Sequence, residues 1–112
     1  MPPDLKATIP VQQPICGSPV ITDLLGGPPD SQPARYHDAS PIELLPLGVP
    51  QVVFGGRMFG PQAAPYETAA RKAGDQVQTS VSDATHFLFI DPESSLWPQV
   101  MQSVSRLLAV ID

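Results

Sequence analysis

The chain has 112 residues, 42% of them hydrophobic, and a formal net charge of −5 at pH 7, which suits one domain with a modest core. Only 6 residues are Lys or Arg, so the composition argues against a surface for nucleic acid or anionic membranes. No apolar run approaches the ~20 residues of a membrane span, the first residues lack a secretory signal pattern, and the single Cys16 cannot form an internal disulfide. We therefore expect a cytoplasmic protein.

Prolines are concentrated in the first half of the chain, where 11 of the 15 lie at or before Pro50. Because proline removes a backbone donor and stops helices, we expect no long helix or central strand there outside short gaps. One such gap, from Leu5 to Val11, predicts a short strand whose pairing is limited by Pro10. Residues 12–39 then read as a connector, either a loop or a reduced lid, with one helical turn from Ile21 to Leu25.

The middle of the chain carries clearer signals. Ser40 and Pro41 are typical of a helix cap and first position, and Pro46 should stop this helix after one or two turns. The apolar run from Gln51 to Phe54, followed by two glycines, predicts a strand buried on both faces of a parallel sheet.

The last part of the chain predicts a helix, a strand and a second helix. An alanine-rich segment from Ala63 to Ala73 ends before Gly74, and Val77 to Val81 reads as a short strand. From near Ser95 almost to Asp112, apolar residues recur at three- and four-residue steps, as in a helix that covers a sheet. We predict an α/β fold over residues 1–112, with a three-stranded parallel sheet, flanking helices and a β-α-β-α unit at 40–112.

Several segments together resemble the C-terminal half of an α/β-hydrolase, closest to esterases and prolyl-oligopeptidase-like serine hydrolases. They are Leu25-Gly26-Gly27-Pro28, Pro33-Ala34-Arg35-Tyr36, Ala39-Ser40-Pro41-Ile42, the run from Leu45 to Val52, His86-Phe87 and Ile90-Asp91-Pro92. The resemblance implies that the segment from Leu5 to Val11 follows the nucleophile helix and that the other two strands are the last of the sheet. It also implies a full-length parent that hydrolyses ester or peptide bonds.

In that family a histidine after the last strand takes the proton of a serine, and an acid after the penultimate strand orients the histidine. His86 fits the position of this general base; otherwise it is a surface-loop histidine with no role. The acid is missing, because Phe59 or Gly60 stands where the carboxylate should be. Of the nearby acids, Asp83 is expected to cap a turn and Asp91 to bind backbone donors before the last helix.

The nucleophile is missing as well, since the chain contains no Gly-x-Ser-x-Gly, and the tripeptide Gly17-Ser18-Pro19 has proline where a helix should begin. Cys16 could serve as a thiol nucleophile, but an incidental cysteine is the simpler interpretation because nothing nearby in sequence would lower its pKa. His37, Asp38 and His86 have no metal-ligand spacing, and no glycine loop predicts a nucleotide. We expect no cofactor.

These observations lead to one functional hypothesis and two alternatives. The chain would be the C-terminal portion of a serine hydrolase, with His86 as a vestigial base and no activity in isolation. Alternatively, it is a non-catalytic interaction module that self-associates or binds a partner chain through an exposed sheet edge at Leu5 to Val11. A third possibility is a complementing half whose partner provides the serine.

Overall fold

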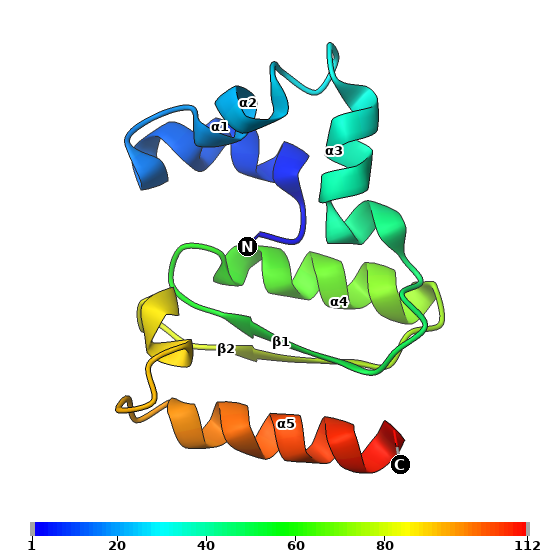
Figure 1. Cartoon of the computed structure of the whole chain (residues 1–112), viewed down its shortest axis with the longest axis vertical. Helices are drawn as coiled ribbons and strands as arrows, with labels where there is room; N and C mark the ends of the chain where they lie inside the picture. The colour runs from blue at the N-terminus through cyan, green and yellow to red at the C-terminus, as the bar shows by residue number, and fades with distance from the viewer. Residues whose placement is uncertain (1, 112) are drawn as a thin grey trace.

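The structure, a computed structural model, describes residues 2–111. In chain order its elements are α1 (Leu5–Cys16), α2 (Val20–Leu25), α3 (Pro33–Ala39), the 3-10 turn η1 (Pro41–Leu44), β1 (Gln51–Gly55), η2 (Gly60–Gln62), α4 (Ala63–Lys72), β2 (Val77–Val81), η3 (His86–Phe89) and α5 (Trp97–Ile111). Figure 1 shows α1 to α3 above, the sheet with α4 in the middle, and α5 below. The fold is mixed α/β, as predicted.

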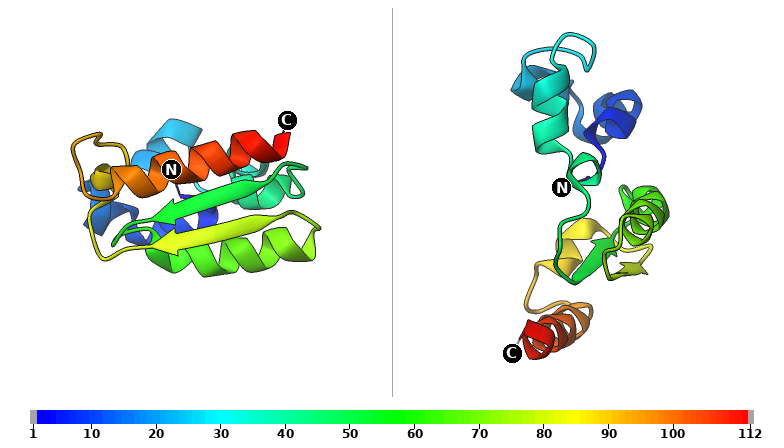
Figure 2. Two further views of the ribbon diagram at one scale, coloured as in Figure 1. Left: turned by 90° about the horizontal axis from the view of Figure 1, so that it is seen from below. Right: turned by 90° about the vertical axis from the view of Figure 1, so that its right-hand side faces the viewer.

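The sheet of the described residues has two strands, β1 and β2, which run parallel with Gln51 opposite Val77 and Gly55 opposite Val81. The predicted strands at these positions, the helix between them and the final helix are confirmed. Helix α4 makes the crossover on one face of the sheet, and α5 lies on the other (Figure 2). The prediction of a third strand from Leu5 to Val11 is wrong, because that segment belongs to α1.

Helix α1 forms because its apolar spacing and its cap both favour a helix. Asp4 accepts a hydrogen bond from the Ala7 amide at 3.0 Å, which satisfies a free donor of the first turn. The buried residues Leu5, Thr8 and Gln12 follow helical steps and share one face. Pro10 and Pro14 are exposed, so the carbonyls that lose a helical partner there lie on the solvent side. The expectation that the prolines exclude a long helix is therefore wrong.

Residues 12–39 are largely helical and not a connector or lid as expected. The predicted turn at Ile21 is present as α2, and Gly26 ends it in the left-handed conformation with φ 82°. Helix α3 begins at Pro33, where the missing N–H costs no helical bond. Its Tyr36 is fully buried and donates a hydrogen bond to the Gly27 carbonyl at 3.0 Å, so the loop between α2 and α3 is fixed to the core of this layer.

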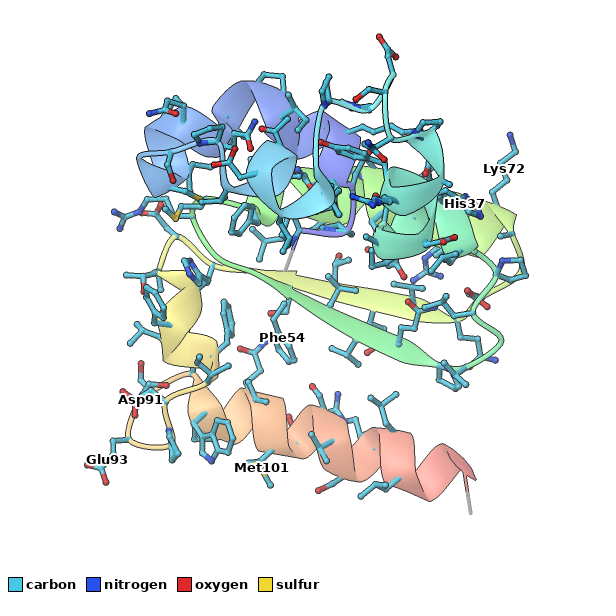
Figure 3. All side chains as sticks on the ribbon, turned by 45° about the horizontal axis from the view of Figure 1, so that its top comes forward. His37, Phe54, Lys72, Asp91, Glu93 and Met101 are labelled. Carbon is cyan, nitrogen blue, oxygen red and sulfur yellow. The ribbon has the colours of Figure 1, made fainter. Side chains whose placement is uncertain are left out.

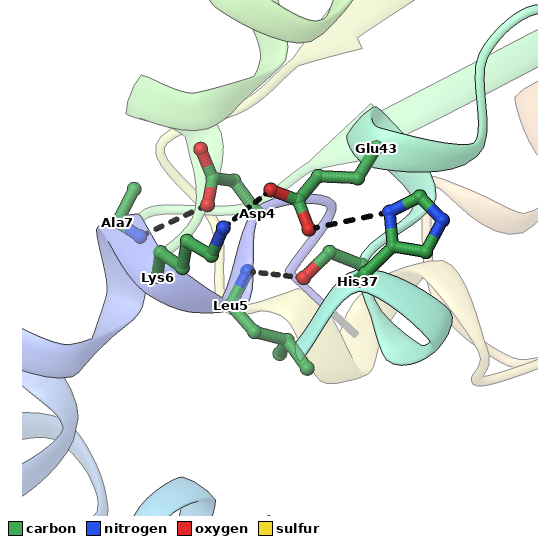
Figure 4. Close-up of polar contacts among 7 residues, drawn as sticks. Asp4, Leu5, Lys6, Ala7, His37 and Glu43 are labelled. Carbon is green, nitrogen blue, oxygen red and sulfur yellow. Dashed lines mark hydrogen bonds and ion pairs between the residues drawn. The ribbon is translucent and has the colours of Figure 1, made fainter. Parts of the chain in front are cut away.

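Figure 4 shows the junction of α1, α3 and η1. The Leu5 amide donates to the hydroxyl of Ser40 at 3.3 Å, so Ser40 serves α1 and makes no side-chain cap for its own short helix. Glu43 accepts from the Lys6 ammonium at 2.6 Å and lies 3.8 Å from the ring of His37. These contacts are exposed or half-buried, where an ion pair contributes little to stability.

Two small cores hold the fold together. One joins Leu5, Ile21 and Tyr36 within the N-terminal helices, and the other joins Tyr66, Ala70 and Val77 between α4 and the sheet. Among the described side chains neither core includes a residue of α5, and Met101, Val104 and Leu108 of this helix are 41–58% exposed. The radius of gyration is 15.1 Å, above the roughly 13 Å of a compact domain of this length. The face of the sheet toward α5 is thus incompletely covered.

Candidate functional site

His86 lies on the loop that follows β2, at the carboxyl end of the two parallel strands, where α/β proteins place their ligands. The Ser82 amide donates to the Gly55 carbonyl at 2.9 Å and extends the ladder beyond β2. The Arg57 amide then donates to the Ala84 carbonyl, also at 2.9 Å. These two bonds hold the loop after β1 against the loop that carries His86.

Gly56 allows this close approach. A Cβ added at Gly56 would lie 2.7 Å from the His86 amide nitrogen and 2.9 Å from its Cα. Both neighbours are backbone atoms, which cannot turn aside as a flexible side chain would. The second glycine of the pair after β1 is therefore required for the position of His86.

The imidazole of His86 lies near two aromatic side chains. Its ring centre is 4.2 Å from that of Phe87 and 5.8 Å from that of Phe59. Its Nδ1 is buried and has no hydrogen-bond partner among residues 2–111. In a serine hydrolase this atom donates to the orienting acid, and here Phe59 contributes an apolar ring to the same neighbourhood. No side chain of the described residues therefore orients the His86 ring through this atom.

Neither of the two acids nearest in sequence, Asp83 and Asp91, bonds to Nδ1 of His86. The side chain of Asp83 is 97% exposed and lies 3.5 Å from the Arg57 guanidinium. The hydroxyl of Ser82 accepts a hydrogen bond from the Ala84 amide and caps the turn. The prediction that Asp83 caps this turn is therefore wrong. Asp91 accepts from the Glu93 amide at 2.9 Å, and its expected role as a backbone acceptor is confirmed.

The other residues singled out in the sequence are not brought to His86 in a way that forms a site. Cys16 is exposed at the last position of α1. His37 lies on α3, where its nearest charged partner is Glu43. Across residues 2–111 no group of three or more His, Cys, Asp or Glu side chains could hold a metal ion.

The cavities are separated from the imidazole. A shallow pocket of about 390 Å³ lies beside the loops at the carboxyl ends of the strands, lined by Gly56, Arg57, Gly60, Pro61, Val81, Ser82 and Asp83. A larger cavity of about 630 Å³ opens at the opposite, amino ends, between the sheet and α5. His86 lines neither of these cavities.

Asp75 is a buried polar residue that the sequence interpretation missed. It is 7% exposed, and its carboxylate accepts from the amides of Leu47 and Gly48 at 2.7 and 2.9 Å and from the Gln51 side chain at 3.0 Å. It therefore fixes the chain that enters β1. Burial, with the charge of Asp75 adding to it, raises the pKa of the neighbouring Tyr66. The sequence offered only an acid after Gly74, a weak signal for this role.

Comparison of the chain with protein families, with curated proteins and with solved structures gave no significant match. No helix in the described part of the chain combines the length and the apolar character that a bilayer-spanning segment needs. The chain thus places a histidine at the carboxyl ends of the strands, and its Nδ1 has no hydrogen-bond partner within residues 2–111. Chemically, an imidazole can accept or donate a proton near neutral pH.

Proposed function

We propose that this chain is the C-terminal portion of a serine hydrolase of the α/β-hydrolase type and that it does not hydrolyse esters in isolation. The observation that carries the proposal is the position of His86 on the loop after the second of two parallel strands, held against the loop after the first. The order of strand, helix, strand, histidine loop and helix is the order that the resemblance implies for the end of such an enzyme.

The lack of isolated activity follows from the surroundings of His86. Its Nδ1 has no acceptor within residues 2–111, and Phe59 and Phe87 flank its ring. Removal of the acid alone lowers turnover about 10⁴-fold in an otherwise complete serine protease, and here no serine is bonded to the imidazole either.

Two experiments test the proposal. Release of p-nitrophenol from p-nitrophenyl butyrate should be the same for the wild type and for His86→Ala. Turnover by the wild type that His86→Ala loses would contradict the lack of activity. The upstream coding region should encode a predicted strand followed by Gly-x-Ser-x-Gly. The absence of this motif would contradict the hydrolase origin.

A second candidate function, an interaction module, is favoured by the free edge of β1. The Gln51 amide donates to the Gln76 carbonyl, and the Gly55 carbonyl accepts from the Ser82 amide. In the parallel register, alternate residues bond to β2, so the main-chain groups of Val52 and Phe54 point away from it. No hydrogen bond to these groups occurs on that side within residues 2–111. An unpaired edge of this kind is a template for another strand.

The edge that we propose for this contact differs from the one expected in the sequence, from Leu5 to Val11. Residues 5–11 are helical and offer no strand edge, so the proposed contact is at β1. Val52→Pro removes an N–H that points outward and leaves the ladder with β2 intact. Sedimentation should show association of the wild type at high concentration and a folded monomer for Val52→Pro.

Val53→Pro serves as the matched control, because its N–H faces β2 and its loss should unfold the sheet. Wild-type chain that stays a stable monomer at every concentration would contradict self-association through this edge.

A further inference from the structure

A cavity lies between the amino ends of the strands and the second half of α5. Its volume of about 630 Å³ falls within the range of small-molecule sites. Apolar walls come from Pro50 and Val52 of the β1 end and from Leu107 and Ala109 of α5. Val77 of β2 also lines the cavity, but its side chain is buried against Tyr66 and Ala70 of α4.

The cavity is open because α5 is attached mainly at its start. Near that end the side chain of Gln99 donates a hydrogen bond to the Ser80 hydroxyl at 2.5 Å. On the same side of the sheet Phe54 projects toward η3, and its ring centre lies 5.2 Å from that of Phe89 (Figure 3). Farther along, Ser103, Leu107 and Ala109 line the cavity from the α5 side. Val52 and Leu107 are only half-buried, so an apolar group between them would remove further surface from water.

Of the charged side chains that line the cavity, one remains without a partner in the described chain. The Arg71 guanidinium binds the Glu67 carboxylate at 2.9 Å and the Val77 carbonyl. The carboxylate of Asp75 is occupied by its three donors. Arg106 makes no ion pair within residues 2–111, and it lines the cavity on the α5 side. Within residues 2–111 the cavity therefore combines apolar walls with one positive charge that forms no ion pair.

We propose that this cavity binds a small amphipathic carboxylate, such as a fatty acid of medium chain length. The alkyl chain lies between Val52 and Leu107, and the carboxylate accepts hydrogen bonds from Arg106, whose planar fork suits a carboxylate. Because the cavity opens at the strand ends opposite His86, this site is separate from the histidine loop and does not depend on a hydrolase function.

The test is titration of the ¹⁵N-labelled full chain with octanoate, followed by amide chemical shifts. Saturable shifts are expected at Val52, Val77, Ser103 and Leu107. Arg106→Gln should weaken binding about tenfold, as for loss of one charge-assisted hydrogen bond. The matched control Lys72→Gln, an exposed cation at the end of α4 outside the cavity lining, should bind as the wild type does.

Two further measurements separate specific binding from general hydrophobic attachment. Octanol, which has the same chain and no charge, should bind more weakly than octanoate. Ser103→Phe, which places a ring in the cavity, should abolish the shifts while the circular dichroism spectrum stays that of the wild type. Shifts spread over the whole surface, equal binding of octanol, or unchanged binding by Arg106→Gln would each overturn the proposal.

Discussion

Gly56 and His86 come from loops that follow different strands, and no side chain fits between their backbones: a Cβ at Gly56 would stand 2.7 Å from the His86 amide nitrogen. Gly56→Ala should therefore displace the histidine loop and lower the free energy of unfolding by about 1–3 kcal/mol, the usual cost of overpacking. Urea denaturation measures this loss. Met58→Ala, an exposed change in the same loop, is the control, and equal stability of the two variants would contradict the close approach.

Helix α1 holds Pro10 in its interior, where proline removes a helical hydrogen bond and clashes with the preceding turn. Pro10→Ala should therefore raise stability by about 1–2 kcal/mol and increase the helical signal at 222 nm. Pro33→Ala is the control, because Pro33 occupies the first position of α3, where its missing N–H costs no helical hydrogen bond. This substitution should not raise the stability. If Pro10→Ala also gave none, residues 5–11 would not be helical.

The carboxylate of Asp75 ties the loop before β1 to the loop before β2. Asp75→Asn keeps the size of the side chain, but it replaces one acceptor oxygen with an NH₂ donor that faces other donors. It should therefore lower the free energy of unfolding by about 2–3 kcal/mol. Thermal unfolding of this variant is compared with that of Asp38→Asn, an exposed change on α3. A similar melting temperature for both variants would show that the three hydrogen bonds to Asp75 do not hold in solution.

Acid should weaken the contact between α4 and β2. The Thr79 hydroxyl and the Arg71 guanidinium hold the pKa of Glu67 below its ordinary value of 4.5. When the pKa of a carboxyl is lower in the folded chain than in the unfolded chain, its ionised form stabilises the fold. This contribution is complete at a pH above the pKa of the unfolded chain, and it is lost as the pH falls through the pKa of the folded chain. Denaturation midpoints measured from pH 6 to 3 should therefore fall less steeply for Glu67→Gln than for the wild type. Glu93→Gln, exposed before α5, should follow the wild-type curve.

The second half of the fold could be predicted because its signals are local. The apolar run before two glycines marks β1, and the three- and four-residue spacing marks α5. The first half could not, because the prolines argued against a long helix and the gap from Leu5 to Val11 was interpreted as a short strand. Its helix depends on the Asp4 cap and on the contact of Leu5 with Ile21 and Tyr36, which sequence spacing does not reveal.

The candidate site divides in the same way. The positions of His86 after the last strand and of Phe59 after the preceding strand could be predicted from the order of residues. The contact of Gly56 with the His86 backbone and the cavity beside Arg106 depend on how loops and helices meet in space. The partner of the Ser40 hydroxyl, the amide of Leu5, is 35 residues away, and no local pattern predicts such a bond.

The state of His86 is tested most directly by a fluorophosphonate, which reacts with a serine only when a base has activated it. Intact-mass measurement after incubation should show no adduct on the wild-type chain and none on His86→Ala, because no acid or serine is bonded to this imidazole in residues 2–111. A single adduct on the wild type that disappears in His86→Ala would mean that the chain holds a complete catalytic site, and it would contradict the proposed lack of activity.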